Sequence, residues 1–159
     1  MAIYSVNNRL AGTQQNLSTT FKTVVGLNAA TATLRRGRLW RMAFGADGAP
    51  NATDCQIVYD VARMTAAGTA TAATPLAPDG TAVATAAVAS VNYTVEPTVT
   101  ATSTLQAFAL NQRASQIWSA YDKDDTLVWP ATNLAGLVLR ALSPTYAAPV
   151  LINASYEDY

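Results

Sequence analysis

Turn-forming residues divide the second half of the chain into short segments, each about as long as a β-strand. The segments cover residues 91–99, 104–111, 114–121, 126–129, 136–142 and 149–156. The breaks between them contain Glu96-Pro97, Asn111-Gln112-Arg113, the acidic run 122–125, residues 130–133 and Ser143-Pro144. Short strands at this spacing are typical of all-β sandwiches and barrels.

The first half of the chain adds three predicted strands. Residues 16–25 are rich in Thr and Val, and residues 55–61 alternate between apolar and polar positions. Residues 37–44 also have a period of two, which predicts that Trp40, Met42 and Phe44 face the core. Cys55 is predicted to be a core residue for the same reason.

These segments predict one all-β domain over residues 16–159, a jelly-roll-like antiparallel β-sandwich of about eight strands. An immunoglobulin-like sandwich is the nearest alternative. Residues 1–15 lack a strong period and are interpreted as an extended N-terminal arm. Residues 65–90 are rich in Thr and Ala and carry a Pro78-Asp79-Gly80 turn signal, so we expect a long loop there, with 81–89 a short helix or an irregular segment.

The charges are few and unevenly placed. Only 13% of the residues are charged, against about 25% in an average soluble domain. Residues 1–46 carry six bases and no acid, whereas residues 47–159 carry four bases and ten acids. Either strands from the two parts pair and neutralise each other, or the basic part forms an edge that docks on an acidic partner.

The residue types argue against catalysis. The chain has no histidine and one cysteine, so it lacks the commonest general base and metal ligand and cannot form an internal disulfide. Asp122 and Asp124 alternate as in a calcium loop, but the glycine and distal glutamate of that motif are absent, and a charged turn explains them. We therefore expect a non-enzymatic protein with no cofactor and no metal.

The strongest candidate site is a cluster of four arginines, Arg35, Arg36, Arg38 and Arg41, around Trp40. Arginines among aromatic residues can bind nucleic acid, because they neutralise phosphates and stack on bases. The neutral total charge of the chain argues against that partner. We favour contacts with another protein, and pairing within the chain is the alternative.

The N-terminal arm supplies the other candidate contacts. Extended segments without periodicity often become ordered against a neighbouring subunit. The arm residues predicted to make such contacts are Tyr4, Asn7, Asn8, Arg9, Gln14 and Gln15.

Nothing in the sequence indicates a membrane partner. The N-terminus has neither a basic region nor a continuous apolar run, and no window approaches the roughly 18 apolar residues that a membrane-spanning helix needs. We expect no secretion signal and no membrane span.

Several stretches resemble small virion proteins of tailed bacteriophages, of the capsid decoration or cement type. The likeness covers most of residues 35–157. It is carried by residues 37–45, by 65–71 before Pro75-Leu76, by 111–114, and by 130–132 followed by 136–140.

This resemblance implies a jelly-roll subunit, a homotrimer, that binds the major capsid protein on the outside of an icosahedral shell. Such a protein is made in the host cytoplasm and stabilises the shell by protein contacts. One alternative is a receptor- or carbohydrate-binding tail-fibre module, for which Trp118, Tyr121 and Trp129 would form a sugar-stacking platform rather than part of the core. Another is a head-completion or tail-tube subunit.

Overall fold

The computed structural model describes residues 2–9 and 13–159, and these residues form strands, turns and loops without any helix. They therefore contain no helix that could cross a membrane. The strands are β1 (Tyr4–Asn7), β2 (Lys22–Ala29), β3 (Gly37–Ala46), β4 (Gln56–Ala66), β5 (Thr69–Ala73), β6 (Ala87–Val95), β7 (Thr98–Asn111), β8 (Ser115–Ser119), β9 (Leu127–Trp129), β10 (Gly136–Leu142) and β11 (Val150–Asp158).

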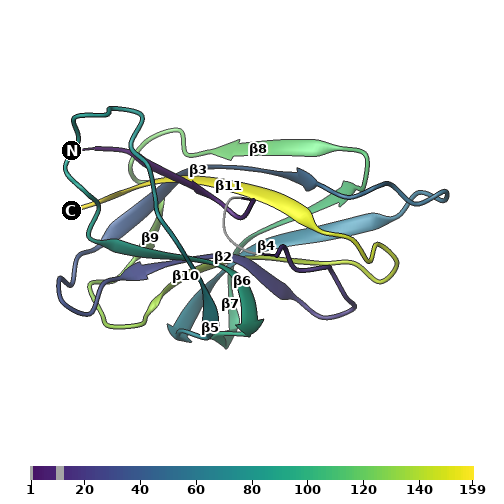
Figure 1. Cartoon of the computed structure of the whole chain (residues 1–159), viewed down its shortest axis with the longest axis horizontal. Coiled ribbons are helices and arrows are strands. Elements are labelled where there is room, and N and C mark those ends of the chain that lie inside the picture. The colour runs from purple at the N-terminus through teal and green to yellow at the C-terminus, as the bar shows by residue number, and fades with distance from the viewer. Residues whose placement is uncertain (1, 10–12) are drawn as a thin grey trace.

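The strands form two antiparallel sheets that face each other (Figure 1). The five-stranded sheet has the order β1-β11-β3-β8, and β9 also pairs with β3. The six-stranded sheet has the order β5-β6-β2-β10-β4-β7. The all-β sandwich predicted from the sequence is therefore confirmed, whereas a jelly-roll topology is not.

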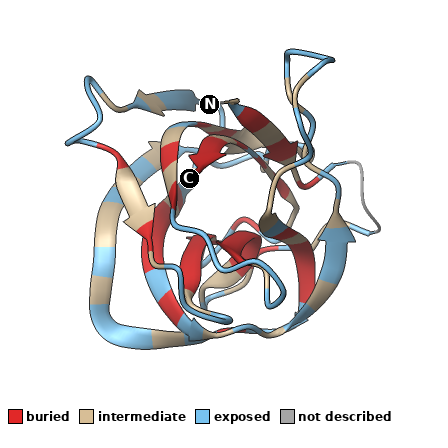
Figure 2. Ribbon diagram, turned by 90° about the vertical axis from the view of Figure 1, so that its left-hand side faces the viewer, coloured by how far each residue is buried: buried red, intermediate tan, exposed pale blue. Residues whose placement is uncertain are grey.

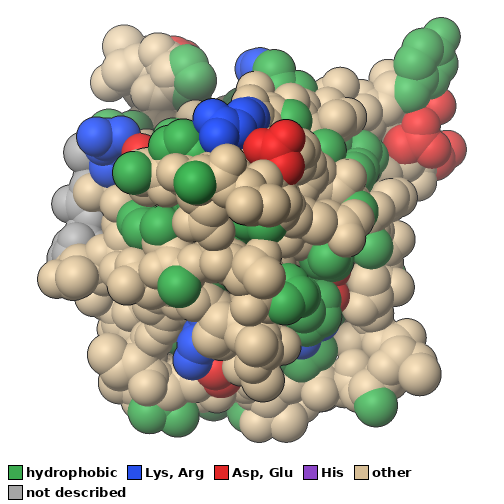
Figure 3. Space-filling view, turned by 90° about the vertical axis from the view of Figure 1, so that its right-hand side faces the viewer, with side chains coloured by type: hydrophobic (Ala, Val, Ile, Leu, Met, Phe, Trp, Pro, Cys, Tyr) green, Lys and Arg blue, Asp and Glu red, His purple; other side chains and the backbone are tan. Residues whose placement is uncertain are grey.

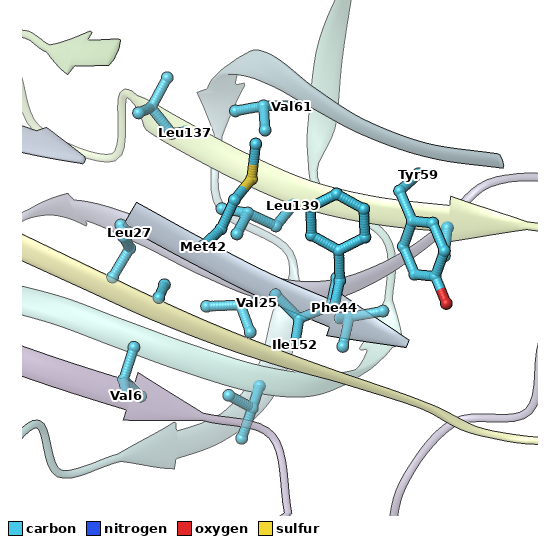
Figure 4. Close-up of a cluster of buried hydrophobic side chains, with 14 of the residues drawn as sticks. Val6, Val25, Leu27, Met42, Phe44, Tyr59, Val61, Leu137, Leu139 and Ile152 are labelled. Carbon is cyan, nitrogen blue, oxygen red and sulfur yellow. The ribbon is translucent and has the colours of Figure 1, made fainter. Parts of the chain in front are cut away.

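The main core lies between the two sheets (Figure 4). Met42, Phe44 and Ile152 come from the five-stranded sheet, and Val25 and Leu139 face them from the other sheet. All five are at most 4% exposed. Burying a side chain of this size stabilises a fold by about 1.5–3 kcal/mol, so the alternation of these strands accounts for much of the stability of the sandwich.

The six-stranded sheet curls because two of its longest segments bend at the same place. Strand β4 continues into β5 through Ala67-Gly68, and β6 continues into β7 through Glu96-Pro97. The four strands form one long ribbon, which pairs Ala66 with Thr98 just before the bend and Thr69 with Val95 just after it. Since β4 also pairs with β10 and β6 with β2, the ribbon brings the sheet round on itself, and the strands follow a closed curve in Figure 2.

The curling buries a second, smaller apolar cluster. Val138 lies between two main-core residues of β10, so its side chain points to the opposite face of the sheet. There it contacts Ala62 and Met64, with Val99 of β7 packed against them. At the bend, a side chain on Gly68 would overlap the backbone of Val95 and Glu96, so only glycine fits.

A buried ion pair lies on the same outer face. Asp60 is 3% exposed, and its carboxylate accepts a hydrogen bond from Arg140 Nε at 2.8 Å and from the Thr104 hydroxyl at 3.1 Å. The Arg140 guanidinium lies 4.4 Å from the centre of the Phe21 ring. Each charged group thus has a partner of opposite charge inside the chain.

Some expectations about segments need correction. The expected loop over 65–90 contains β5 and the start of β6, and 81–89 is irregular only as far as Ala86. The extended arm over 1–15 is not confirmed, because residues 4–7 form β1, which pairs with β11. Residues 1 and 10–12 of that arm lie outside the described residues.

Replacing Asp60 alone by Leu should lower the free energy of unfolding by about 3–5 kcal/mol, because it leaves the Arg140 charge buried and unpaired. The double variant Asp60→Leu/Arg140→Leu should recover most of that loss. Urea unfolding of both variants measures the difference. Equal losses in the single and double variants would show that the ion pair is not the reason for the change.

Stability should also fall in alkali because buried tyrosines must stay neutral. Burial raises the pKa of Tyr93 to about 12, and the nearby Glu96 carboxylate adds to the rise. The phenol ionises near pH 10 when unfolded, so its contribution is complete below pH 10 and is lost as the pH rises towards 12. At pH 11 the loss from Tyr93 should be about 1.4 kcal/mol.

Burial also raises the pKa of Tyr59 and Tyr156, so a Tyr93→Phe variant should keep part of this alkaline loss. Urea unfolding midpoints at pH 8 and pH 11 test the assignment. The wild type should lose more stability than Tyr93→Phe between the two pH values. An identical loss in both proteins would contradict the role given to Tyr93.

Candidate functional site

The outer face of the five-stranded sheet carries mostly small or polar side chains, of which some are exposed and others half-buried. The strand register places Asn7, Asn153, Ala43 and Ile117 in one row across β1, β11, β3 and β8. A second row contains Ser5, Ser155, Arg41 and Ser119. Residues in one row point to the same side, and their neighbours Val6, Ala154 and Met42 point into the core. We call these two rows the outer sheet face.

A β-bulge directs two arginines of β3 to the outer side of this sheet, and one of them, Arg41, belongs to the outer sheet face. Arg41 pairs with Ser155 but Leu39 pairs with Tyr156, so Trp40 has no opposite residue in β11. The extra residue shifts the in-out alternation of β3 by one position. Arg38 and Arg41, which are three residues apart, therefore both point outward. The prediction that Trp40 faces the core is corrected here: Leu39 is fully buried and Trp40 is partly exposed. Met42 and Phe44 are core residues as predicted.

Arg38 is held by the fold. Its Nε lies 3.0 Å from a Glu157 carboxylate oxygen, and both side chains are mostly buried. Its guanidinium also lies 4.2 Å from the centre of the Tyr159 ring. These contacts explain Arg38 without any partner protein.

The other three predicted arginines form no ion pair with a described carboxylate. Within residues 2–9 and 13–159, Arg35, Arg36 and Arg41 make no salt bridge, and all three are exposed. Arg36 is 6.0 Å from the centre of the Tyr159 ring, and its carbonyl accepts the Tyr159 N–H at 2.9 Å. Three guanidinium groups are therefore available to an acidic partner.

The uneven charge distribution is partly resolved inside the chain. Ion pairs join Arg9 to Asp47, Lys22 to Glu96 and Arg38 to Glu157, so each links the basic first 46 residues to the acidic remainder. Three of the six early bases therefore pair internally, as the first interpretation predicts. Docking of the other three on an acidic partner stays a prediction.

Two of the predicted arm contacts are buried within the fold. The Tyr4 hydroxyl donates to the Val83 carbonyl at 2.6 Å, and its ring packs against Tyr156 at 5.8 Å. The Asn8 amide donates to the Val150 carbonyl at 2.8 Å, and its side-chain oxygen accepts the Ile152 N–H at 2.9 Å. Tyr4 and Asn8 are therefore removed from the predicted surface, because their polar atoms and apolar area are already used.

The remaining arm residues lie nearer the surface. Arg9 and Gln14 both contact the Asp47 carboxylate, at 3.0 and 2.9 Å, so these two side chains lie against the turn after β3. Gln15 is half-buried. Asn7 is also half-buried and belongs to the outer sheet face, as Arg41 does. The structure brings only these two of the ten predicted residues into the two rows.

The three aromatic residues considered for sugar binding do not form one platform. Trp129 is fully buried, with its ring 5.5 Å from that of Tyr156. Trp118 is partly buried against the core, whereas Tyr121 is 93% exposed. Side chains in such different surroundings cannot stack together on a sugar.

The acidic run forms a turn. The Asp122 carboxylate accepts the N–H groups of Asp124 and Asp125 at 2.8 and 3.2 Å. In the part of the chain that the structure describes, no three His, Cys, Asp or Glu residues are grouped so that they could hold a metal ion. The run is therefore a turn between two strands that the Asp122 side chain stabilises by accepting backbone N–H groups.

Exposed apolar side chains border the outer sheet face. Ile117 lies in the first row and is 56% exposed. At the opposite edge, Leu76 is 64% exposed and exchanges two backbone hydrogen bonds with Ser5, at 2.8 and 3.0 Å. The loop containing Leu76 thus covers the free edge of β1 and adds apolar area beside the face.

Comparison with models of known protein families and with curated proteins finds no match for this chain.

Arg38 and Arg41 should behave differently when each is replaced by Ala. Arg38→Ala leaves Glu157 buried without its ion-pair partner and should lower the thermal unfolding midpoint measurably. Arg41→Ala removes an exposed side chain without an ion pair and should leave the midpoint nearly unchanged. Equal shifts in the two variants would contradict the bulge-based assignment.

Proposed function

We propose that this protein is a structural virion protein that binds the outside of an icosahedral phage capsid and stabilises the shell by protein contacts. In this proposal its partners are the major capsid protein and two further copies of itself in a homotrimer. The outer sheet face is the observation that carries the proposal.

The chemistry of the outer sheet face suits binding to a protein surface. Ser5, Ala43, Ser119 and Ser155 are small, so a partner backbone can approach the sheet closely. Small side chains lose little conformational freedom when they are covered, which lowers the entropic cost of association. Ile117 adds apolar area, and the hydroxyl and amide groups of the two rows can donate and accept hydrogen bonds across the contact.

The free arginines indicate the charge of the partner. Arg41 lies within the outer sheet face, and Arg35 and Arg36 precede β3 at one end of it. An acidic partner surface would pair with these guanidiniums, speed the encounter and fix the orientation of the complex.

Repetition on a shell would strengthen such contacts. A protein that binds the assembled lattice more tightly than free coat protein shifts the equilibrium towards the assembled state. A trimer that engages several lattice sites at once gains affinity through its high effective concentration. The resemblance of residues 35–157 to capsid decoration proteins supports this setting, and an assembly role needs no catalytic group.

The double variant Arg35→Ala/Arg41→Ala should bind capsid shells assembled without the protein at least tenfold more weakly than the wild type, while its unfolding midpoint stays the same. Co-sedimentation with the shells measures the binding. The matched control is Arg63→Ala/Arg113→Ala, which removes the same charge from two exposed arginines elsewhere.

The control should bind like the wild type. If both double variants lose affinity equally, the effect comes from total charge and the proposed surface is rejected. If the wild type itself does not sediment with shells, the proposed function is rejected.

A further inference from the structure

Strand β7 has one edge without a partner strand. It pairs with β4 along one side, and no other described strand pairs with it. Its first half is interrupted by bulges, and Thr102 has a positive φ of 64°. Its second half is regular, because the pairing runs without a break from Val61 opposite Gln106 to Gln56 opposite Asn111.

One hydrogen bond shows which backbone groups of this regular stretch point outward. The Gln112 N–H donates to the Cys55 carbonyl at 3.0 Å, so every second residue before it also bonds to β4. The alternate residues Ala107, Ala109 and Asn111 therefore direct their N–H and C=O groups to the open side. Only the Asn111 carbonyl is occupied, by the Ala114 N–H at 2.9 Å, and a carbonyl can accept a second bond.

The bulges protect only the first half of the β7 edge, and the regular stretch 106–111 lacks the protection that natural sheets use. Residues 106–111 read Gln-Ala-Phe-Ala-Leu-Asn, with no charge and no proline. Phe108 and Leu110 are only partly buried, although both pack against the core and Phe108 lies 5.0 Å from Phe44. Edge strands of monomers usually carry a lysine, a proline or a bulge, because an uncharged edge recruits another strand. Figure 3, which views the molecule from the right-hand side of Figure 1, shows charged side chains only in scattered places.

The sequence of the stretch is complementary to itself when reversed. With Ala109 opposite Ala109 of a second copy, Ala107 lies opposite Asn111 and Phe108 opposite Leu110. Ala109 and the pair Ala107–Asn111 then meet on the side of the sheet that points away from the core. Phe108 and Leu110 meet on the side that faces the core, and no like charges approach each other. This register uses all three outward-pointing residues and stays within the regular stretch.

We infer that residues 106–111 of β7 pair antiparallel with the same residues of a second copy about a twofold axis. The contact joins the six-stranded sheets of the two copies into one continuous sheet. In each copy it covers part of Phe108 and Leu110, which are only partly buried in the single chain. It uses an edge and leaves the outer sheet face free, so it does not depend on capsid binding. If the chain also forms trimers, this contact links neighbouring trimers.

Charge substitutions at Ala109 test the inference in purified protein. The two Ala109 side chains should lie roughly 5 Å apart across the axis, so Ala109→Asp and Ala109→Lys should each place like charges opposite each other. Each variant alone should have a lower mass than the wild type by light scattering at the highest soluble concentration: one subunit where the wild type is a dimer, and one trimer where the wild type consists of linked trimers. An equimolar mixture of the two should recover the full mass, because Asp then faces Lys.

Ala101→Asp is the matched control. Ala101 is exposed on the same strand but lies in the bulged half, so this variant should keep the wild-type mass. Unchanged unfolding midpoints show that the variants fold. The inference is overturned if the Ala109 variants keep the wild-type mass, if the mixture does not recover it, or if the control loses it too.

Discussion

The crossing of two strand bends at Gly68 determines how the rest of the six-stranded sheet is arranged. A side chain at this position would overlap the backbone of Val95 and Glu96, so the ribbon of β4, β5, β6 and β7 can bend sharply only with glycine there. The bend curls the sheet and buries the Met64 cluster behind the main core. It also leaves β7 at the end of the sheet, with its second edge uncovered. The same close backbone contact at Gly68 thus has two consequences. It allows the second apolar cluster to form, and it leaves β7 with the only long, regular open edge among the described residues.

The chain has few charged residues, and its arginines fall into two groups: some are paired with acids of the fold, and others are exposed without an ion pair. Arg140 and Arg38 pair with Asp60 and Glu157 at partly buried positions, where each arginine has a carboxylate of the same chain beside it. The free arginines lie beside or on the outer sheet face, where they are exposed to water and can pair with acids of a partner. A surface of this kind suits repeated protein contacts, and this is the physical basis of the proposed role in a virion.

The sequence predicts the strands best where one side of a strand is strongly apolar. Residues 37–44 and 55–61 alternate clearly, so β3 and β4 could be located, and the all-β class follows from the turn residues between later strands. The bulge at Trp40 could not be predicted, because an extra residue is seen only in the pairing with β11. β5 was hidden because its Thr and Ala side chains are mostly exposed and show no core pattern.

The candidate site was predictable only in part. Arg35, Arg36 and Arg41 stood out because basic residues are concentrated before residue 47. Ser5, Asn153 and Ser155 gave no signal, since small polar residues become a surface only when the register aligns them across strands. The alternation of Tyr4 and Val6 with Ser5 and Asn7 is the one signal that could have identified β1 in place of an arm.

The most direct test of the central claim is an image of the protein on its proposed partner. Electron cryomicroscopy of capsid shells incubated with the purified protein shows which surface contacts the lattice. The account predicts density on the outside of the shell, with the outer sheet face and Arg41 against the capsid protein. Bound density with that face turned to solvent, or shells without any added density, would contradict it.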